Sequence, residues 1–309
     1  MHSLAKQRAM VANTTPPVQN MNAEIHPSLR TRIARGLRFG RSIRGWGRLT
    51  RLIAGTPANP AYIISNPTGW FAGSLDSVLE SQVYFFGGYE EDLIGAFLGL
   101  FTDQNKRVII DVGANIGTHS IAFARHFNRV VCFEPNEAVF PKLQRNISNN
   151  QLSNVTACNY GLGDVSDNMS FYSIDNGNEG LGTFLNVEQY DRDLQKIGEF
   201  RIECGDDVLA DIIDSPIDAI KLDIQGFEPQ ALAGLRKTLE AHRPITWVEL
   251  GNGTQSSISE QDGIVSLFPY PVDVFCFETV RGFLTSQTRL RKLEHIENYV
   301  GDVVICPKA

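Results

Sequence analysis

The stretch Val108-Ile109-Ile110-Asp111-Val112-Gly113-Ala114-Asn115-Ile116-Gly117 decides the fold. It joins a run of β-branched residues, typical of a buried strand, to a glycine-rich turn, and residues 118–127 after it have the pattern of a helix. Ligands of an open α/β sheet bind beyond the carboxyl ends of its strands, where a strand turns into a helix. The stretch therefore predicts a cofactor site at this turn.

Apolar strand patterns alternate with helical patterns on both sides of the turn. Buried strands are predicted at 107–113, 129–135, 154–163, 217–226 and 245–250, with helices at 118–127, 137–150 and 229–243. This alternation indicates a parallel sheet covered by helices on both faces. Two further strands, 271–278 and 299–307, have no long helix between them and predict an antiparallel C-terminal hairpin. We expect a Rossmann-like α/β fold with a mostly parallel seven-stranded sheet.

The chain divides into three parts by composition. Residues 1–54 form a polar, then basic N-terminal extension that is expected to be partly disordered, and residues 55–106 form a helical lead-in. Residues 107–309 form the main domain, with an insertion at 164–216 between the third and fourth parallel strands. Connections at this edge of a sheet carry function on a rigid scaffold, so we expect the insertion to select the substrate.

Charge is distributed unevenly along the 309 residues, whose net charge is −7. Residues 1–51 carry ten Lys or Arg and one acid, Glu24, which leaves a net charge of −16 on the remainder. The acidic body argues against a large nucleic-acid groove. For the basic residues 28–54, two interpretations stay open: a solvated or packing extension, and peripheral contact with an anionic membrane or an acidic saccharide.

The chain shows no sign of export or of membrane insertion. It has no apolar run long enough to span a bilayer and no signal-peptide core at its start, so a cytoplasmic location is the expectation. Its five cysteines are odd in number and form no Cys-x-x-Cys pair. They are expected to be reduced thiols, neither disulfides nor zinc ligands.

Two acidic residues indicate which kind of ligand the glycine turn would bind. Asp111 ends the first strand, and Glu134, 23 residues later, ends the second, where an acid can accept both ribose hydroxyls of a nucleoside. A nicotinamide dinucleotide site would prefer G-x-G-x-x-G and no acid beside its pyrophosphate. Here the glycine spacing is G-x-x-x-G, and the carboxylate of Asp111 suits the amino and sulfonium cations of S-adenosylmethionine better.

The sequence also resembles the FkbM family of methyltransferases. The resemblance covers roughly residues 83–250 and is carried by YFFGGYEEDL, IIDVGANIGTHS, VVCFEPN, NYGLGD, IDAIKLDIQGFEPQALAGL and, more weakly, PITWVEL. It implies S-adenosylmethionine as methyl donor and O-methylation of a sugar, glycolipid or polyketide-like natural product. The implied cofactor residues are Asp111, Gly113, Asn115, Gly117 and Glu134, with Asn159, Gly161 and Asp164 near the adenine. One departure is Gln225, where the family usually has an acid.

Methyl transfer to an alcohol needs a group that removes the hydroxyl proton. Asp223 lies at the end of the fourth strand and is the first choice for the base or for an acceptor-orienting group. Glu228 and Glu249 are second choices, and Glu228 has the alternative role of charging the next helix N-terminus. Acids converging at strand ends can also hold Mg²⁺. His119 is read as a packing or capping residue, with a catalytic role as the alternative.

Three other function classes stay open. The first is a nucleic-acid methyltransferase guided by the basic tail, although the expected Pro-Pro-aromatic motif after the fourth strand is missing. The second is a catalytically degenerate binding protein, in which Gln225 marks lost activity. The third is a nicotinamide oxidoreductase. The identity of the acceptor and the oligomeric state do not follow from the sequence.

Overall fold

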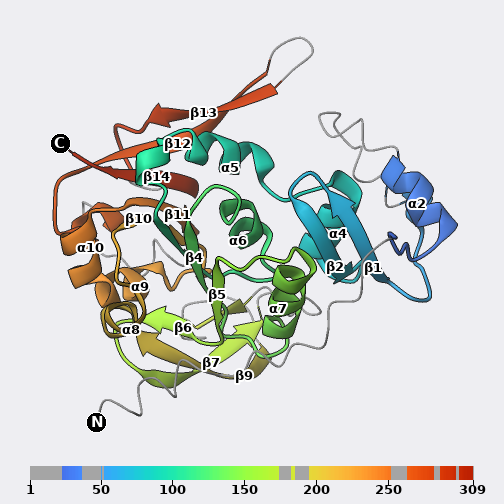
Figure 1. The fold of residues 1–309 in the computed structure, drawn as a ribbon, viewed down its shortest axis with the longest axis horizontal. Helices are drawn as coiled ribbons and strands as arrows, with labels where there is room; N and C mark the ends of the chain where they lie inside the picture. The colour runs from blue at the N-terminus through green and yellow to red at the C-terminus, as the bar shows by residue number, and fades with distance from the viewer. Residues whose placement is uncertain are drawn as a thin grey trace.

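The computed structural model describes residues 23–36, 50, 52–173, 182–184, 195–251, 263–281, 286–296 and 299–308. A central sheet of eight strands runs through the molecule (Figure 1). Its strands, in spatial order, are β13 (Ser286–Lys292), β12 (Val272–Arg281), β14 (Gly301–Pro307), β11 (Ile245–Leu250), β10 (Ile217–Leu222), β3 (Val108–Val112), β4 (Arg129–Phe133) and β5 (Val155–Cys158). The five strands from β11 to β5 are parallel, whereas β14 is antiparallel to both β11 and β12.

The predicted α/β fold is confirmed, but the sheet has eight strands and not seven. The additional strand is β13, which pairs antiparallel with β12 at the edge. Its sequence, SQTRLRK, is polar and charged, as is common for an edge strand that resists further pairing. Such a strand has no continuous apolar run, and for this reason the hydrophobic pattern did not indicate it.

Two predicted elements are divided in the structure. The expected strand 154–163 splits into β5 and β6 (Gly161–Gly163), and β6 belongs to a second sheet of order β6-β9-β7-β8. The expected helix 229–243 splits at Leu235 into α9 (Glu228–Gly234) and α10 (Arg236–His242). The second sheet is completed by β7 (Asp167–Ser173), β8 (Gly182–Thr183) and β9 (Gln195–Cys204), and α8 (Gly205–Ile212) follows it. The described residues of the insertion 164–216 therefore form three strands of this small sheet and one helix.

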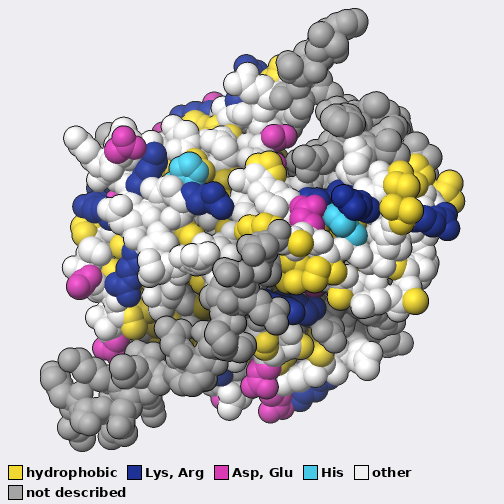
Figure 2. Space-filling model, turned by 45° about the vertical axis from the view of Figure 1, so that its right-hand side comes forward, with side chains coloured by type: hydrophobic (Ala, Val, Ile, Leu, Met, Phe, Trp, Pro, Cys, Tyr) yellow, Lys and Arg dark blue, Asp and Glu magenta, His cyan; other side chains and the backbone are white. Residues whose placement is uncertain are grey.

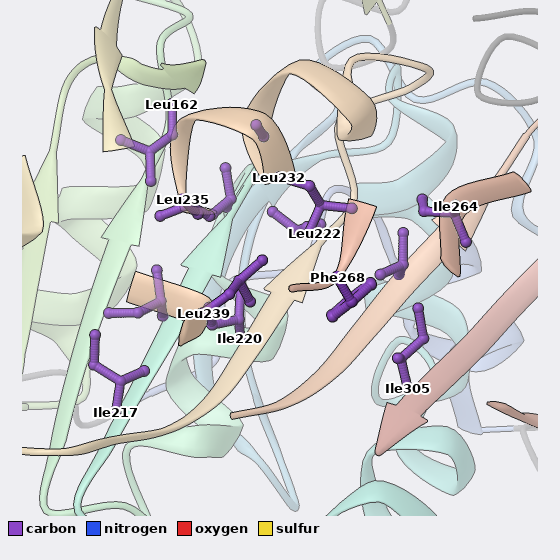
Figure 3. Packing of buried hydrophobic residues seen from close by; sticks show 14 of the residues in the cluster. Leu162, Ile217, Ile220, Leu222, Leu232, Leu235, Leu239, Ile264, Phe268 and Ile305 are labelled. Carbon is purple, nitrogen blue, oxygen red and sulfur yellow. The ribbon is translucent and has the colours of Figure 1, made fainter. Parts of the chain in front are cut away.

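Helices cover both faces of the central sheet. On one face, alternate residues of the strands pack with leucines of α8, α9 and α10 and with η4 (Gly263–Leu267), as Figure 3 shows for Leu222, Leu232 and Ile305. On the other face, α5 (Glu91–Leu98) and α6 (Thr118–Phe123) cover a second apolar layer that includes Ile109 and Trp247. Helix α7 (Phe140–Asn149) contacts β5.

The α5–α6 face becomes polar toward the carboxyl ends of the strands. Strand side chains alternate between faces, so the residues two positions beyond Ile109, Ala219 and Trp247 lie on the same face as that apolar layer. These residues are Asp111, Lys221 and Glu249. Lys221 pairs with Asp111 and with Trp247, whereas Glu249 lies two residues beyond Trp247 on β11 and pairs with Asp302. Register thus gathers charged side chains on one face, at the carboxyl ends of the strands beside the glycine turn.

The lead-in 55–106 is not wholly helical, contrary to the prediction. It begins with an antiparallel hairpin of β1 (Ala61–Asn66) and β2 (Gly69–Ser74), followed by α4 (Val78–Phe86), α5 and η2 (Asp103–Asn105). The side-chain carbonyl of Asn66 accepts hydrogen bonds from the amides of Thr68 and Gly69 and closes the hairpin turn.

This hairpin packs directly on the glycine turn. Tyr62, Phe71 and Tyr84 share a core with Ile116 of the turn. Asn146 of α7 donates to the Ile116 carbonyl at 2.9 Å and accepts from the Ala72 amide at 2.8 Å, so one side chain joins the hairpin to the turn.

The start of the basic extension packs against the hairpin as helix α2 (Leu29–Gly36). Arg35, 8% exposed, makes an ion pair with Glu24 and donates to the carbonyls of Tyr84 and Ser65. At least this arginine has a packing role. The arginines at 38, 41, 44, 48 and 51, the glycine-rich stretch 177–181 and residues 1–22 lie outside the described residues. No helix within the described ranges is long and apolar enough to cross a membrane.

Candidate active site

A cavity lies at the carboxyl ends of β3, β4, β10 and β11, where the glycine turn predicted a ligand. It holds about 770 Å³ of atom-free space, its open mouth included. Five predicted site residues line it: Gly113, Asn115, Glu134, Asp223 and Glu249. The remaining lining residues are Leu79, Tyr89, Ala114, Thr118, His119, Pro135, Asn136, Phe171, Phe184, Ile224 and Gln225. Six predicted residues do not line it: Asp111, Gly117, Asn159, Gly161, Asp164 and Glu228.

Gly113 brings two loops together. Its φ is +84°, and a Cβ at this position would lie 2.1 Å from the carbonyl oxygen of Asp223. The turn after β3 can therefore contact the loop after β10 only because residue 113 has no side chain. Gly117 has φ +92° and begins α6, where a Cβ would lie 2.7 Å from Leu143. Both glycines shape the cavity, but only Gly113 also lines it.

Glu134 is held at the cavity by backbone amides. Its two carboxylate oxygens each accept one N–H at 2.9 Å, from Asn115 on the glycine turn and from Asn136. Burial raises its pKa to about 7, although both amide hydrogen bonds act in the opposite direction. A carboxylate offers about four acceptor positions. Two of them remain for hydroxyl groups of a ligand.

Asp111 lies beneath the turn and not in the cavity wall. It is fully buried, and Ser120 of α6 donates to its Oδ2 at 2.5 Å. Its Oδ1 has no hydrogen-bond partner among the described residues. The geometry therefore does not favour the expected direct contact with a cofactor cation. A buried carboxylate at this depth acts on a bound cation through its electric field.

Three residues expected near an adenine have other positions. The Asn159 amide donates to the Glu134 carbonyl at 2.9 Å and thereby supports the loop that carries Glu134. Gly161 is buried where a Cβ would lie 2.7 Å from Ile202, so it serves packing. Asp164 is exposed. The chain turns away from the cavity here because β6 enters the second sheet, which the sequence pattern did not reveal.

Asp223 forms a buried ion pair at the inner end of the cavity. Its Oδ2 accepts a hydrogen bond from Lys221 Nζ at 2.9 Å, and Lys221 lies 5.6 Å from the centre of the Trp247 ring. Burial alone would raise the pKa of Asp223, but the Lys221 ammonium outweighs it and the pKa is lowered. The ion pair with Lys221 thus stabilises the negative charge of Asp223 from the inner side of the cavity, while the Asp223 side chain remains 28% exposed.

Glu249 and Gln225 complete a network around Asp223. The Gln225 amide donates to Glu249 Oε2 at 2.7 Å and to Asp223 Oδ1 at 3.4 Å. Burial and the neighbouring Asp223 carboxylate raise the pKa of Glu249 well above its usual range. The two carboxyl groups share a hydrogen bond, so the arrangement fits one charged and one protonated acid. The side chain at position 225 is a neutral amide. A carboxylate at this position would repel those of Asp223 and Glu249.

Glu228 stabilises the loop that carries Gln225. It is fully buried, and its Oε1 accepts hydrogen bonds from the amides of Ile224 at 3.0 Å and Gly226 at 3.1 Å. Gln225 lies between these amides and has φ +54°. The geometry favours the alternative interpretation of Glu228, as a residue that stabilises the start of α9 and the loop before it.

His119 lines the cavity beside a carboxylate that the sequence did not single out. Its Nε2 lies 3.2 Å from Glu90 Oε2, and its ring packs edge-on against Tyr89 and Trp247. Tyr89 also lines the cavity, whereas the nearby Tyr84 and Phe85 are buried in the core. Tyr89 and His119 thus belong to the cavity wall, whereas Trp247 is buried in the apolar core.

Backbone strain is concentrated around the cavity. Five non-glycine residues in the described chain have positive φ: Glu90, Asn115, Gln151, Gln225 and Arg243. Asn115 and Gln225 line the cavity, and Glu90 contacts His119. A left-handed conformation costs a non-glycine residue about 1 kcal/mol or more, and such strain clusters at functional sites.

The acids of the site do not form a metal centre. Within the described residues, no three His, Cys, Asp or Glu side chains are arranged to hold a metal ion. The Lys221 ammonium, which donates to Asp223 Oδ2 at 2.9 Å, places a positive charge where it would repel a cation. The predicted Mg²⁺ has no support from this geometry.

The parallel sheet, its reversed strand β14 and the glycine turn define a class I methyltransferase fold. Residues 111–268, just over half of the chain, match the methyltransferase FkbM domain, and the chain therefore belongs to the FkbM methyltransferase family.

Two curated relatives align with this part of the chain. Hexuronic acid methyltransferase AglP of Haloferax volcanii is 29% identical over 156 residues, which are 49% of this chain and 59% of that protein. Methyltransferase 1 of Beauveria bassiana is 30% identical over 144 residues, which are 41% of this chain and 57% of that protein. The chain thus spans less than two thirds of either relative.

Two solved structures are similar in outline. A methyltransferase FkbM from Methylobacillus flagellatus has 19% identity and a TM-score of 0.40, covering 74% of this chain and 48% of that one. An O-methyltransferase from Bacillus cereus, in complex with SAH, has 16% identity and a TM-score of 0.38, covering 69% of this chain and 80% of that one.

Proposed function

We propose that the protein is an S-adenosylmethionine-dependent O-methyltransferase that acts on a hydroxyl of a saccharide, a glycolipid or a related natural product. One observation carries the proposal: a single cavity joins the glycine turn and Glu134 to the network of Asp223, Gln225 and Glu249. The first group suits a nucleoside cofactor, and the second suits an alcohol. Membership of a methyltransferase family supports the pairing.

The cofactor half of the cavity fits S-adenosylmethionine. Glu134 keeps free acceptor positions for ribose hydroxyls after binding two backbone amides. Asp111, with one unpartnered buried oxygen in the described structure, favours positive charge at the turn. When bound, this cofactor supplies a methyl carbon made electrophilic by a sulfonium. Gly113, Asn115 and Glu134 would hold it.

The acceptor half is built to orient a hydroxyl and to take its proton. Asp223 is the group that stays ionised, because Lys221 secures its charge. It can accept a hydrogen bond from the acceptor hydroxyl and receive the proton when the oxygen forms its new bond to carbon. Glu249 and Gln225 fix the position of Asp223 and present further polar groups to the acceptor.

A saccharide acceptor has two supports. Carboxylate and amide groups beside the aromatic rings of Tyr89, Phe171 and Phe184 are a set that binds the polar edges and apolar faces of sugars. Phe171 and Phe184 come from the insertion, in agreement with its proposed part in acceptor selection. The relative AglP is named for a hexuronic acid, which is a sugar.

The test has two stages, titration and transfer. Calorimetric titration with S-adenosylmethionine should show stoichiometric binding, and titration with NADH none. Labelled methyl should then pass to hydroxyl acceptors in a panel of glycosides and glycolipids. Cofactor binding without transfer to any alcohol would favour a degenerate binding protein. Transfer to RNA bases would favour the nucleic-acid alternative, and the absence of cofactor binding would overturn the whole proposal.

A further inference from the structure

Helix α2 exposes its two large apolar side chains, Leu29 and Ile33, to solvent. Its buried side consists of Thr31, Ala34 and Arg35. Leu29 and Ile33, four residues apart and therefore neighbours on one helix face, are 73% and 52% exposed. A surface helix normally turns its apolar stripe to the core. This reversal indicates that the outer face of α2 serves contact with something else.

The exposed apolar residues are concentrated in this part of the molecule. Six large apolar side chains of the described chain are more than half exposed: Ile25, Leu29, Ile33, Leu52, Val165 and Val300. Four of the six lie between residues 25 and 52. Leu52, 74% exposed, adjoins Ile53, whose carbonyl accepts a hydrogen bond from Arg30 of α2 at 3.1 Å. We call Leu29, Ile33 and Leu52 the apolar patch.

Positive charge surrounds this patch. Arg30 and Arg32 of the same helix are exposed. Helix α2 lies on the right in Figure 1. On the right of Figure 2, hydrophobic and basic side chains lie beside one another. Residues 28–54 contain eight arginines and no acid, whereas the rest of the chain is strongly acidic. The charge of the sequence is thus polarised, and in the described structure the exposed Arg30 and Arg32 lie on the same helix as Leu29 and Ile33.

We propose that the apolar patch and its arginines dock this end of the protein on an anionic membrane surface. Apolar side chains that enter the acyl boundary, together with arginines that contact anionic head groups, are the combination that binds peripheral proteins to such membranes. A symmetric contact between two copies of this face would place Arg30 and Arg32 against like charges. A nucleic acid would use the arginines but leave the apolar patch without a partner.

Vesicle flotation of the full-length chain tests the docking without any need for turnover. The protein should float with mixed phosphatidylcholine–phosphatidylglycerol vesicles and remain in solution with pure phosphatidylcholine vesicles. The double variant Leu29→Ser/Ile33→Ser should lower the bound fraction by about tenfold or more, because two buried side chains are lost from the bilayer. Arg32→Glu should weaken binding to the anionic vesicles, and the binding that remains should depend less on salt, because part of the electrostatic attraction is lost.

The control is the double variant Val165→Ser/Val300→Ser, which removes equally exposed apolar side chains elsewhere. It should float like the unchanged protein, and the melting temperature of every variant should be unchanged. Failure of the full chain to bind anionic vesicles would overturn the proposal. Flotation of the Leu29→Ser/Ile33→Ser variant equal to that of the unchanged protein would also overturn it. The same holds if the unchanged protein is a dimer that does not bind vesicles and this variant is a monomer. It holds as well if the protein binds RNA through its arginines and the Leu29→Ser/Ile33→Ser substitutions have no effect on that binding.

Discussion

The two halves of the cavity are held together in different ways. On the cofactor side, Glu134 is positioned by backbone amides, and the Gly113 amide donates a hydrogen bond to the Phe133 carbonyl at 3.0 Å. On the acceptor side, Asp223, Gln225 and Glu249 are positioned mainly by one another and by Lys221. A backbone cradle tolerates substitution of the side chains around it, whereas a side-chain network fails when one member changes. We therefore expect the acceptor half to be the more sensitive half.

The largest effect is expected at Asp223. Asp223→Asn keeps the size of the side chain and an oxygen for Lys221 but removes the proton acceptor. Turnover should fall by about 10²–10⁴-fold, while the affinity for S-adenosylmethionine should be nearly unchanged. Methyl-transfer assays and calorimetry measure the two quantities separately. Turnover that survives in this variant would remove Asp223 from the mechanism.

Gly113→Ala should damage both halves together. The new Cβ would lie 2.1 Å from the Asp223 carbonyl at a φ of +84°, so we expect a loss of about 2–4 kcal/mol in the free energy of unfolding. Denaturant titration measures it. The matched control is Gly95→Ala in α5, where a Cβ meets nothing within 4 Å. That substitution should raise stability by about 0.5–1 kcal/mol. Equal stability of both variants would contradict the proposed contact between the loops.

The stability of the ligand-free protein should fall as the pH rises from about 5 to 7. Burial raises the folded-state pKa of Glu134 to about 7 and that of Asp302 to about 6. The folded protein therefore binds more protons than the unfolded chain in this window, and stability is lost as these acids ionise. For Glu134 alone the loss should be about 1–3 kcal/mol. Melting temperatures across the window measure it, and Glu134→Gln should flatten the slope. A slope that is unchanged in this variant would show that Glu134 does not titrate there.

The smallest effect is expected at Gln225. Gln225→Ala removes the amide that joins Asp223 to Glu249, so turnover should fall by several-fold, roughly the loss of about 1 kcal/mol of hydrogen bonding. Its pH profile should also shift, because the two acids are no longer held together. Gln225→Glu should be worse than Gln225→Ala, since it places a third carboxyl group in the network. If the glutamate variant is the more active one, the amide has a different role.

The sequence predicted the cofactor half well because its signals are contiguous. The turn from Asp111 to Gly117 and the acid at Glu134 lie in consecutive strand–turn units, and Asn115 and Glu134 are indeed joined. The acceptor half depends on which strands are neighbours and in what register. The contact of Gln225 with Glu249, for example, needs the pairing of β10 with β11.

The errors have equally local reasons. Asn159 to Asp164 were expected at the cavity, because a continuous apolar strand hides the turn at which the chain enters the second sheet. Glu90 was missed because nothing in the lead-in sequence indicates that its carboxylate lies beside His119. The edge strand β13 was missed because its residues carry no apolar pattern.

The side chain of Asn146 affects which segments of the molecule unfold together. It bonds to Ala72 of the hairpin and to Ile116 of the glycine turn at once, inside a core that both segments share. Segments joined in this way separate together or not at all, so β1, β2 and the start of α6 should form one cooperative unit in native-state hydrogen exchange. The cofactor turn would then owe its rigidity to residues more than thirty positions before it, outside the segment that defines the family.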